Sequence, residues 1–108
     1  VAPPRDVGPR QLSSKVAHSR LAINPSAAPY RVRLPPALER GGQSFTATVR
    51  ICVSGEGRVT QVNVLRSAGA AVDKQIPSVL GRWRYRPLVE DGRALPFCYQ
   101  LQYEVSGR

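Results

Sequence analysis

The side chains able to carry chemistry are few in this chain of 108 residues: two cysteines, one histidine and seven acidic residues. Cys52 and Cys98 lie far apart in the sequence, no CxxC motif occurs, and His18 is distant from both cysteines. Structural zinc sites need closely spaced Cys and His ligands, so this spacing does not predict a metal site. Two interpretations of the cysteines stay open: a disulfide bond between them, or two buried thiols.

An enzyme is not predicted either. His18 has no serine or cysteine arranged with it in a catalytic pattern. The adjacent acidic residues Glu90 and Asp91 stand in "EDGR", which is typical of a turn. We therefore expect a binding protein that uses no cofactor and no metal.

The chain is strongly basic, with sixteen Lys and Arg against seven Asp and Glu and a formal net charge of +9. Such a balance favours an anionic partner such as nucleic acid, lipid headgroups, a cell-wall polymer or an acidic protein face. The arginines are scattered singly except in "RWRYR" at residues 82–86, which disfavours nucleic acid. A solvated basic surface is the first interpretation, and capture of an anionic surface is the second.

The chain contains no apolar run long enough to span a membrane and no signal peptide. It begins "VAPPRDVGPR", without methionine, so we expect a piece of a longer protein. Residues 1–33 carry five prolines and few large apolar side chains, which predicts an extended or loosely docked linker or arm, with a short docked strand over 19–24 as an option. Residues 34–108 are expected to form the folded domain.

Within that domain, "LPPALERGG" at residues 34–42 predicts a short helix that begins near its prolines and stops at Gly41. Period-two alternation of apolar and polar residues predicts strands over 44–54, 58–67 and 96–105. The first two strands are joined by a glycine-containing turn, which indicates a hairpin.

A helix is predicted between the second and third strands. Its apolar residues stand at helical spacing, namely Val72, Ile76, Leu80 and Trp83. Pro77 is tolerated only near a first turn, so the helix should begin at Asp73, which would be its N-cap.

The predicted fold class is α+β with two layers. A helix that follows the second strand runs back over the sheet, so the third strand fits antiparallel beside the first. This gives a three-stranded antiparallel sheet of order 2-1-3, with one main helix on one face and a short N-terminal helix. Cys52 and Cys98 then lie on the polar faces of neighbouring strands, which favours the disulfide over free thiols and implies an oxidising compartment.

The third predicted strand would leave one edge of the sheet unpaired along "FCYQLQYEV". After Pro96 this strand contains no proline, no lysine and a single charge, Glu104. Sheet edges are normally blunted by such residues, and an unguarded edge invites another strand. We therefore expect a partner to add a strand at this edge.

Three stretches of the sequence form a recognisable combination: "LPPALERGG", the hairpin "VRICVSGEGRVTQVNVLRSAG", and "LGRWRYRP" followed by "DGRALP". Together they resemble the C-terminal domain of TonB, the periplasmic energy transducer of Gram-negative bacteria, over about residues 34–105. Leu34-Pro35 stands where that family usually has Tyr-Pro, and Pro77 and the cysteine pair are further departures.

The resemblance implies that the last strand pairs with a short peptide, the TonB box, of an outer-membrane TonB-dependent transporter. It implies a periplasmic domain that is anchored to the inner membrane by an N-terminal segment and passes proton-motive work from an ExbB/ExbD-type motor to the transporter. The partner-binding residues would be Cys98, Tyr99, Gln100, Leu101, Gln102, Tyr103, Glu104 and Val105.

Other interpretations of the binding protein stay open. One is a TolA-like scaffold domain of a motility or secretion machine, which binds envelope proteins without powering import. Another is a basic binder of an anionic cell-wall or lipid surface, whose affinity would depend strongly on salt. An open strand edge also allows two copies of the isolated domain to pair as a homodimer.

Overall fold

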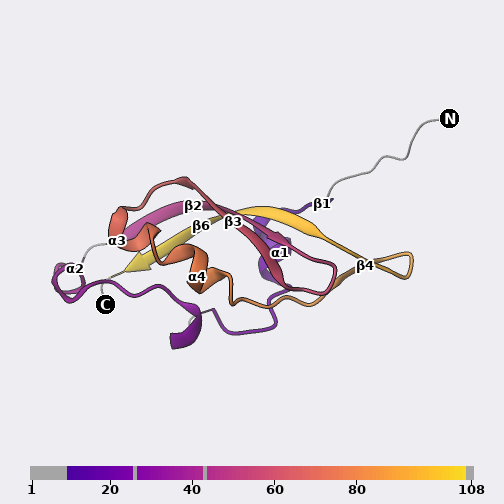
Figure 1. Ribbon diagram of the computed structural model, residues 1–108, viewed down its shortest axis with the longest axis horizontal. Coiled ribbons are helices and arrows are strands. Elements are labelled where there is room, and N and C mark those ends of the chain that lie inside the picture. Colours follow the sequence, from indigo (N-terminus) through magenta and orange to yellow (C-terminus); the bar gives the residue numbers. More distant parts are fainter. Residues whose placement is uncertain (1–9, 26, 43, 107–108) are drawn as a thin grey trace.

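The computed structural model describes residues 10–25, 27–42 and 44–106 (Figure 1). Within these residues a four-stranded sheet has the order β1-β6-β2-β3, and a separate two-stranded hairpin, β4–β5, projects at one end of the molecule (Figure 1). The elements in chain order are β1 (Arg10–Gln11), α1 (Ser14–His18), the 3-10 helix η1 (Ala28–Tyr30), α2 (Pro36–Arg40), β2 (Ser44–Val53), β3 (Val59–Arg66), α3 (Ala70–Asp73), α4 (Ile76–Leu80), β4 (Leu88–Glu90), β5 (Arg93–Leu95) and β6 (Phe97–Ser106).

The two long strands form the centre of the sheet. β2 and β6 pair antiparallel without interruption, from Ser44 opposite Ser106 to Val53 opposite Phe97. The alternation of apolar residues in β2 puts one face into the core, where the buried side chains are Ala47, Val49, Ile51 and Val53. The α+β class, the three predicted strands and the short helix at α2 are confirmed.

The predicted three-stranded sheet of order 2-1-3 is wrong as a whole because a fourth strand joins it, although the three predicted strands are neighbours in that order as β3-β2-β6. β1 pairs parallel with the start of β6, with Arg10 opposite Phe97 and Gln11 opposite Cys98. The sheet is therefore mixed, and not a three-stranded antiparallel sheet of order 2-1-3. A two-residue strand is too short to show period-two alternation, so the sequence carries no signal for β1.

The predicted main helix is interrupted. Residues 70–80 are helical as α3 and α4, separated by a turn at Lys74 and Gln75. Pro77 has no N–H to donate to the carbonyl of Asp73, so a continuous helix would lack that bond. Asp73 is not the predicted N-cap, because it ends α3, and its carboxylate accepts hydrogen bonds from the Ala68 N–H at 2.9 Å and from the Ser67 hydroxyl.

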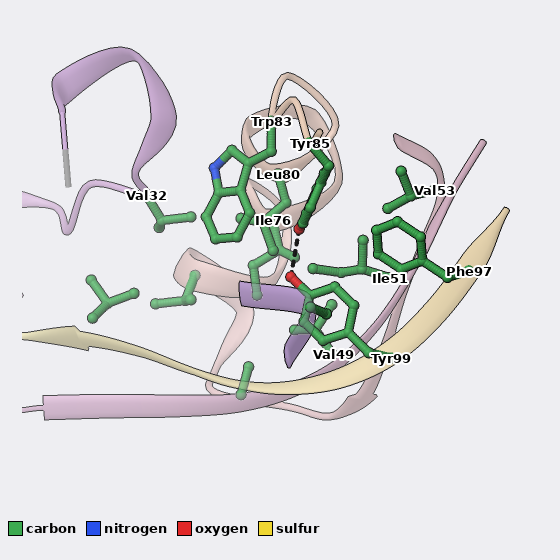
Figure 2. Close-up of a cluster of buried hydrophobic side chains, with 14 of the residues drawn as sticks. Val32, Val49, Ile51, Val53, Ile76, Leu80, Trp83, Tyr85, Phe97 and Tyr99 are labelled. Atoms are coloured by element: carbon green, nitrogen blue, oxygen red, sulfur yellow. Dashed lines mark hydrogen bonds between the residues drawn. The ribbon is translucent and has the colours of Figure 1, made fainter. Parts of the chain in front are cut away.

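The core lies between the helical segment and the sheet (Figure 2). Val72, Ile76 and Leu80 are buried from the helical side. Trp83 is 1% exposed, and its indole Nε1–H donates to the Tyr30 carbonyl at 2.7 Å, so it is a core residue. The aromatic ring of Tyr85 packs edge-on against Phe97 and Tyr99, with centroids 5.7 Å and 6.1 Å away.

A second backbone ladder runs through residues 84–86. The Tyr85 N–H donates to the Gly57 carbonyl at 2.9 Å, and isolated bridges join Leu21 to Tyr85 and Arg58 to Arg84. Gly57 has a positive φ of +87°, and a Cβ there would lie 2.0 Å from the Tyr85 carbonyl oxygen. The turn after β2 therefore needs glycine for both its conformation and its close backbone contact.

The described part of the predicted arm contacts the domain. Ala17 is fully buried, Val32 is 4% exposed, and both belong to the core. The option of a docked strand over 19–24 corresponds to the single bridge at Leu21. The division of the chain at residue 33 stays a prediction, and residues 1–9 lie outside the described residues.

Candidate functional site

The cysteines form a disulfide bond between neighbouring strands. Cys52 lies directly opposite Cys98 in the β2–β6 ladder, with their Cα atoms 4.1 Å apart. Such close spacing is typical of a pair that exchanges no backbone hydrogen bonds, where side chains are nearest. The disulfide interpretation is confirmed, and the alternative of two free thiols is wrong.

The outer side of β6 is only partly paired. The Pro96 carbonyl accepts from the Arg10 N–H at 3.1 Å, and the Cys98 carbonyl accepts from the Leu12 N–H at 2.9 Å. Alternate residues of a strand direct their backbone groups to the same neighbour, so Gln100, Gln102 and Glu104 also direct theirs outward. Among the described residues, no backbone–backbone hydrogen bond from another segment reaches these three.

We call the outer side of β6 from Tyr99 to Val105 the open edge. It is shorter than the sequence predicts, because β1 covers the strand at Cys98. The side chains of Gln100, Gln102 and Glu104 are exposed, whereas those of Tyr99 and Val105 are buried. Tyr99 belongs to the core and Tyr103 packs against it, and the partner-binding role of residues 98–105 stays a prediction.

The opposite edge of the sheet is blunted. β3 carries two extra residues relative to β2: Thr60 falls between the pairs of Cys52 and Val53, and Leu65 falls between those of Thr48 and Val49. Such bulges twist an edge away from regular pairing. The β2–β6 register has no such irregularity, so the two edges of the sheet differ in their fitness for strand addition.

A cleft of about 390 Å³ adjoins the open edge. One wall is β6 from Leu101 to Val105, and the remaining lining includes Trp83 and the arm residues His18 and Arg31. The His18 ring lies edge-on to Trp83 with centroids 6.4 Å apart. No sequence pattern indicates this cleft, because the arm residues reach it only through tertiary packing.

Burial in the core keeps two tyrosines neutral to high pH. Tyr85 and Tyr99 share a hydrogen bond between their hydroxyls (Figure 2). Burial raises the pKa of Tyr99 to about 12, and burial together with the neighbouring Tyr99 raises the pKa of Tyr85. Burial also raises the pKa of Tyr103, whose hydroxyl accepts from the Val32 N–H at 2.9 Å.

We expect the free energy of unfolding to fall steeply above about pH 10. Tyrosine ionises near pH 10 in an unfolded chain, whereas the pKa of Tyr99 in the folded state is about 12. The folded state keeps protons that the unfolded state loses, so this stability is complete below pH 10 and is lost as the pH rises toward 12. The loss is about 1.4 kcal/mol per pH unit for each such tyrosine.

Urea unfolding at a series of pH values would measure this decline. The variant Tyr85→Phe/Tyr99→Phe removes both hydroxyls together, so neither is left buried without a partner. Its stability should decline more gently in the same range. An equally steep decline in the double variant would contradict the assignment to these two side chains.

The site therefore offers backbone donors and acceptors along an edge, with a cleft beside it. Among the described residues, no group of three or more His, Cys, Asp or Glu side chains could hold a metal ion. A domain of this kind is equipped to bind an extended chain segment.

The comparison with known families agrees with a domain that binds an extended chain segment. The family model for the Gram-negative bacterial TonB protein C-terminal domain matches residues 30–105. The chain belongs to this family. Its members are periplasmic, non-enzymatic energy transducers, and membership implies an interaction with TonB-dependent outer-membrane transporters. No curated protein matches the chain. In the described part of the chain no helix is long and apolar enough to cross a membrane.

Proposed function

We propose that this domain docks onto an outer-membrane TonB-dependent transporter by strand addition at the open edge of β6. Main-chain hydrogen bonds to the outward groups of Gln100, Gln102 and Glu104 would supply affinity. The observation that carries the proposal is the contrast between the two sheet edges. β6 is regular and, among the described residues, its outer side has no backbone partner beyond Cys98, whereas β3 is bulged.

The proposed role is mechanical. A segment upstream of the domain anchors it in the inner membrane and couples it to an ExbB/ExbD-type motor. The docked strand then receives proton-motive work through β6, which the disulfide at Cys98 fastens to β2. The cleft takes side chains of the docked strand that point to the helical side of the sheet, because alternate residues of a strand face opposite sides.

An NMR titration of the labelled domain with TonB-box peptides from transporters of the same organism tests the proposal. Shifts concentrated on residues 99–105 are expected. If these peptides leave the edge unperturbed while another envelope protein perturbs it, the TolA-like scaffold function replaces the transducer.

A proline at residue 102 should weaken docking at least tenfold. Gln102→Pro removes one outward N–H and places a ring at the edge, while the β2–β6 bonds come from the neighbouring residues. Gln102→Ala keeps the N–H and should bind within twofold of the unchanged domain. Peptide titrations with both variants, after a check of their melting temperatures, give the comparison.

The two variants also separate main-chain from side-chain recognition. If Gln102→Pro binds as well as the unchanged domain, the open edge is not the docking site. If Gln102→Ala loses as much affinity as Gln102→Pro, the side chain is recognised and main-chain pairing is not the source of affinity.

A further inference from the structure

Four arginines gather on the ladder that runs through residues 84–86, apart from β6. Arg58 lies directly opposite Arg84, and the bridge between Leu21 and Tyr85 places Arg20 opposite Arg86. The backbone contacts are close, with the Arg86 N–H donating to the Arg20 carbonyl at 2.7 Å. Residues opposite each other share a face, and Tyr85 is buried, so these side chains occupy the outer face. We call Arg20, Arg58, Arg84 and Arg86 the arginine cluster.

The arginine cluster has no acidic counterpart among the described residues. The ion pair found among the described residues joins Arg10 to Glu90, both outside the cluster. No described carboxylate lies within 4.0 Å of a cluster guanidinium. The nearest acidic residue in sequence is Glu56, in the turn before Arg58. Like charges placed directly opposite each other are unfavourable in a ladder, and here two such pairs are adjacent.

Three of the four guanidinium groups are held in place by backbone carbonyls. Arg84 donates to the carbonyls of Arg82 and Trp83 at 3.2 Å and 3.1 Å, and Arg86 donates to that of Ser19 at 2.6 Å. Arg20 donates to the carbonyls of Arg86 and Pro87. A guanidinium has five N–H donors, so each keeps donors for a ligand while its side chain is already ordered.

We propose that the arginine cluster is a phosphate-binding site, for phosphate groups of a soluble compound or of a lipid headgroup. Opposed side chains start about 5 Å apart and successive ones on a face about 7 Å apart. Several guanidinium groups can therefore reach one phosphate. A phosphate has more acceptor oxygens and more negative charge than a carboxylate, so it can accept bidentate hydrogen bonds from two guanidinium groups. The site is separate from strand docking and does not depend on it.

Titration with pyrophosphate at constant ionic strength tests the site, with acetate as the carboxylate comparison. Backbone NMR shifts should concentrate on residues 20–22, 57–58 and 84–86, and pyrophosphate should bind at least tenfold more tightly than acetate. Phosphatidylcholine vesicles with and without phosphatidic acid form the lipid arm. Binding in either arm supports the site and identifies its source, whereas binding in neither overturns it.

Arg58→Gln is the cleanest variant, because no described group accepts a hydrogen bond from the Arg58 guanidinium. It should weaken pyrophosphate binding at least fivefold and leave the melting temperature unchanged or higher, since a repulsive pair is lost. Arg66→Gln, at an exposed position on β3, makes the same change in net charge and should alter binding less than twofold. If both variants weaken binding equally, the effect is one of net charge and the site is refuted.

Discussion

Replacing Gly57 with alanine should lower the free energy of unfolding by about 3–5 kcal/mol. The added Cβ would lie 2.0 Å from the Tyr85 carbonyl oxygen, which is backbone and cannot rotate away. Relief requires residues 57 and 85 to separate, which breaks the 2.9 Å hydrogen bond between them. Tyr85 is 3% exposed, so the movement also disturbs its packing on Phe97 and Tyr99.

Gly92→Ala is the matched control for this prediction. Gly92 also has a positive φ, +76°, but a Cβ there meets nothing within 4 Å. Its cost should be limited to the backbone strain, about 1 kcal/mol. Urea unfolding of both variants gives the difference, and equal losses would show that the contact with Tyr85 contributes nothing.

Loss of the disulfide should cost about 4 kcal/mol of stability, the estimate from chain entropy for cysteines 46 residues apart. The variant Cys52→Ala/Cys98→Ala removes the bond without leaving a thiol. Small domains are stable by roughly 5–15 kcal/mol, so this is a large share of the total. Denaturant unfolding of the oxidised domain, the reduced domain and the double variant would measure it.

The reduced domain and the double variant should agree closely, because both lack the same cross-link. If the double variant is as stable as the oxidised domain, the bond contributes nothing at equilibrium. Single-molecule pulling offers a second measurement, since a bond between β2 and β6 should raise the force needed to detach β6. An unchanged unfolding force in the double variant would contradict the mechanical role proposed for it.

The sequence was sufficient for the elements whose burial repeats along the chain. β2 and β6 show apolar residues at every second position, and Val72, Ile76 and Leu80 show the helical spacing. The disulfide followed from the same pattern, because both cysteines are out of phase with the core face. These local patterns were informative because each element packs a single face against the core, so its buried residues repeat at the period of the strand or helix.

Features set by distant contacts were not predictable. β1 has two residues and is placed by hydrogen bonds to a strand more than eighty residues later, so no local pattern identifies it. Pro77 lies in the first turn of α4, as the sequence argument requires, but that argument began the helix at Asp73 and did not foresee the separate helix α3 before it. The cleft needs His18, Arg31 and Trp83 together, and nothing in their sequence spacing indicates that they meet.

The unequal edges of the sheet set a limit on self-association. Two copies joined along their open edges would form a closed pair with twofold symmetry and leave their β3 edges outermost. The bulges at Thr60 and Leu65 stop further growth there, so the chain can form a pair but not a filament through its sheet. If the proposed docking is right, each copy can accept one strand at this edge. A second copy and the transporter would then compete for it, and dilution would favour the transporter.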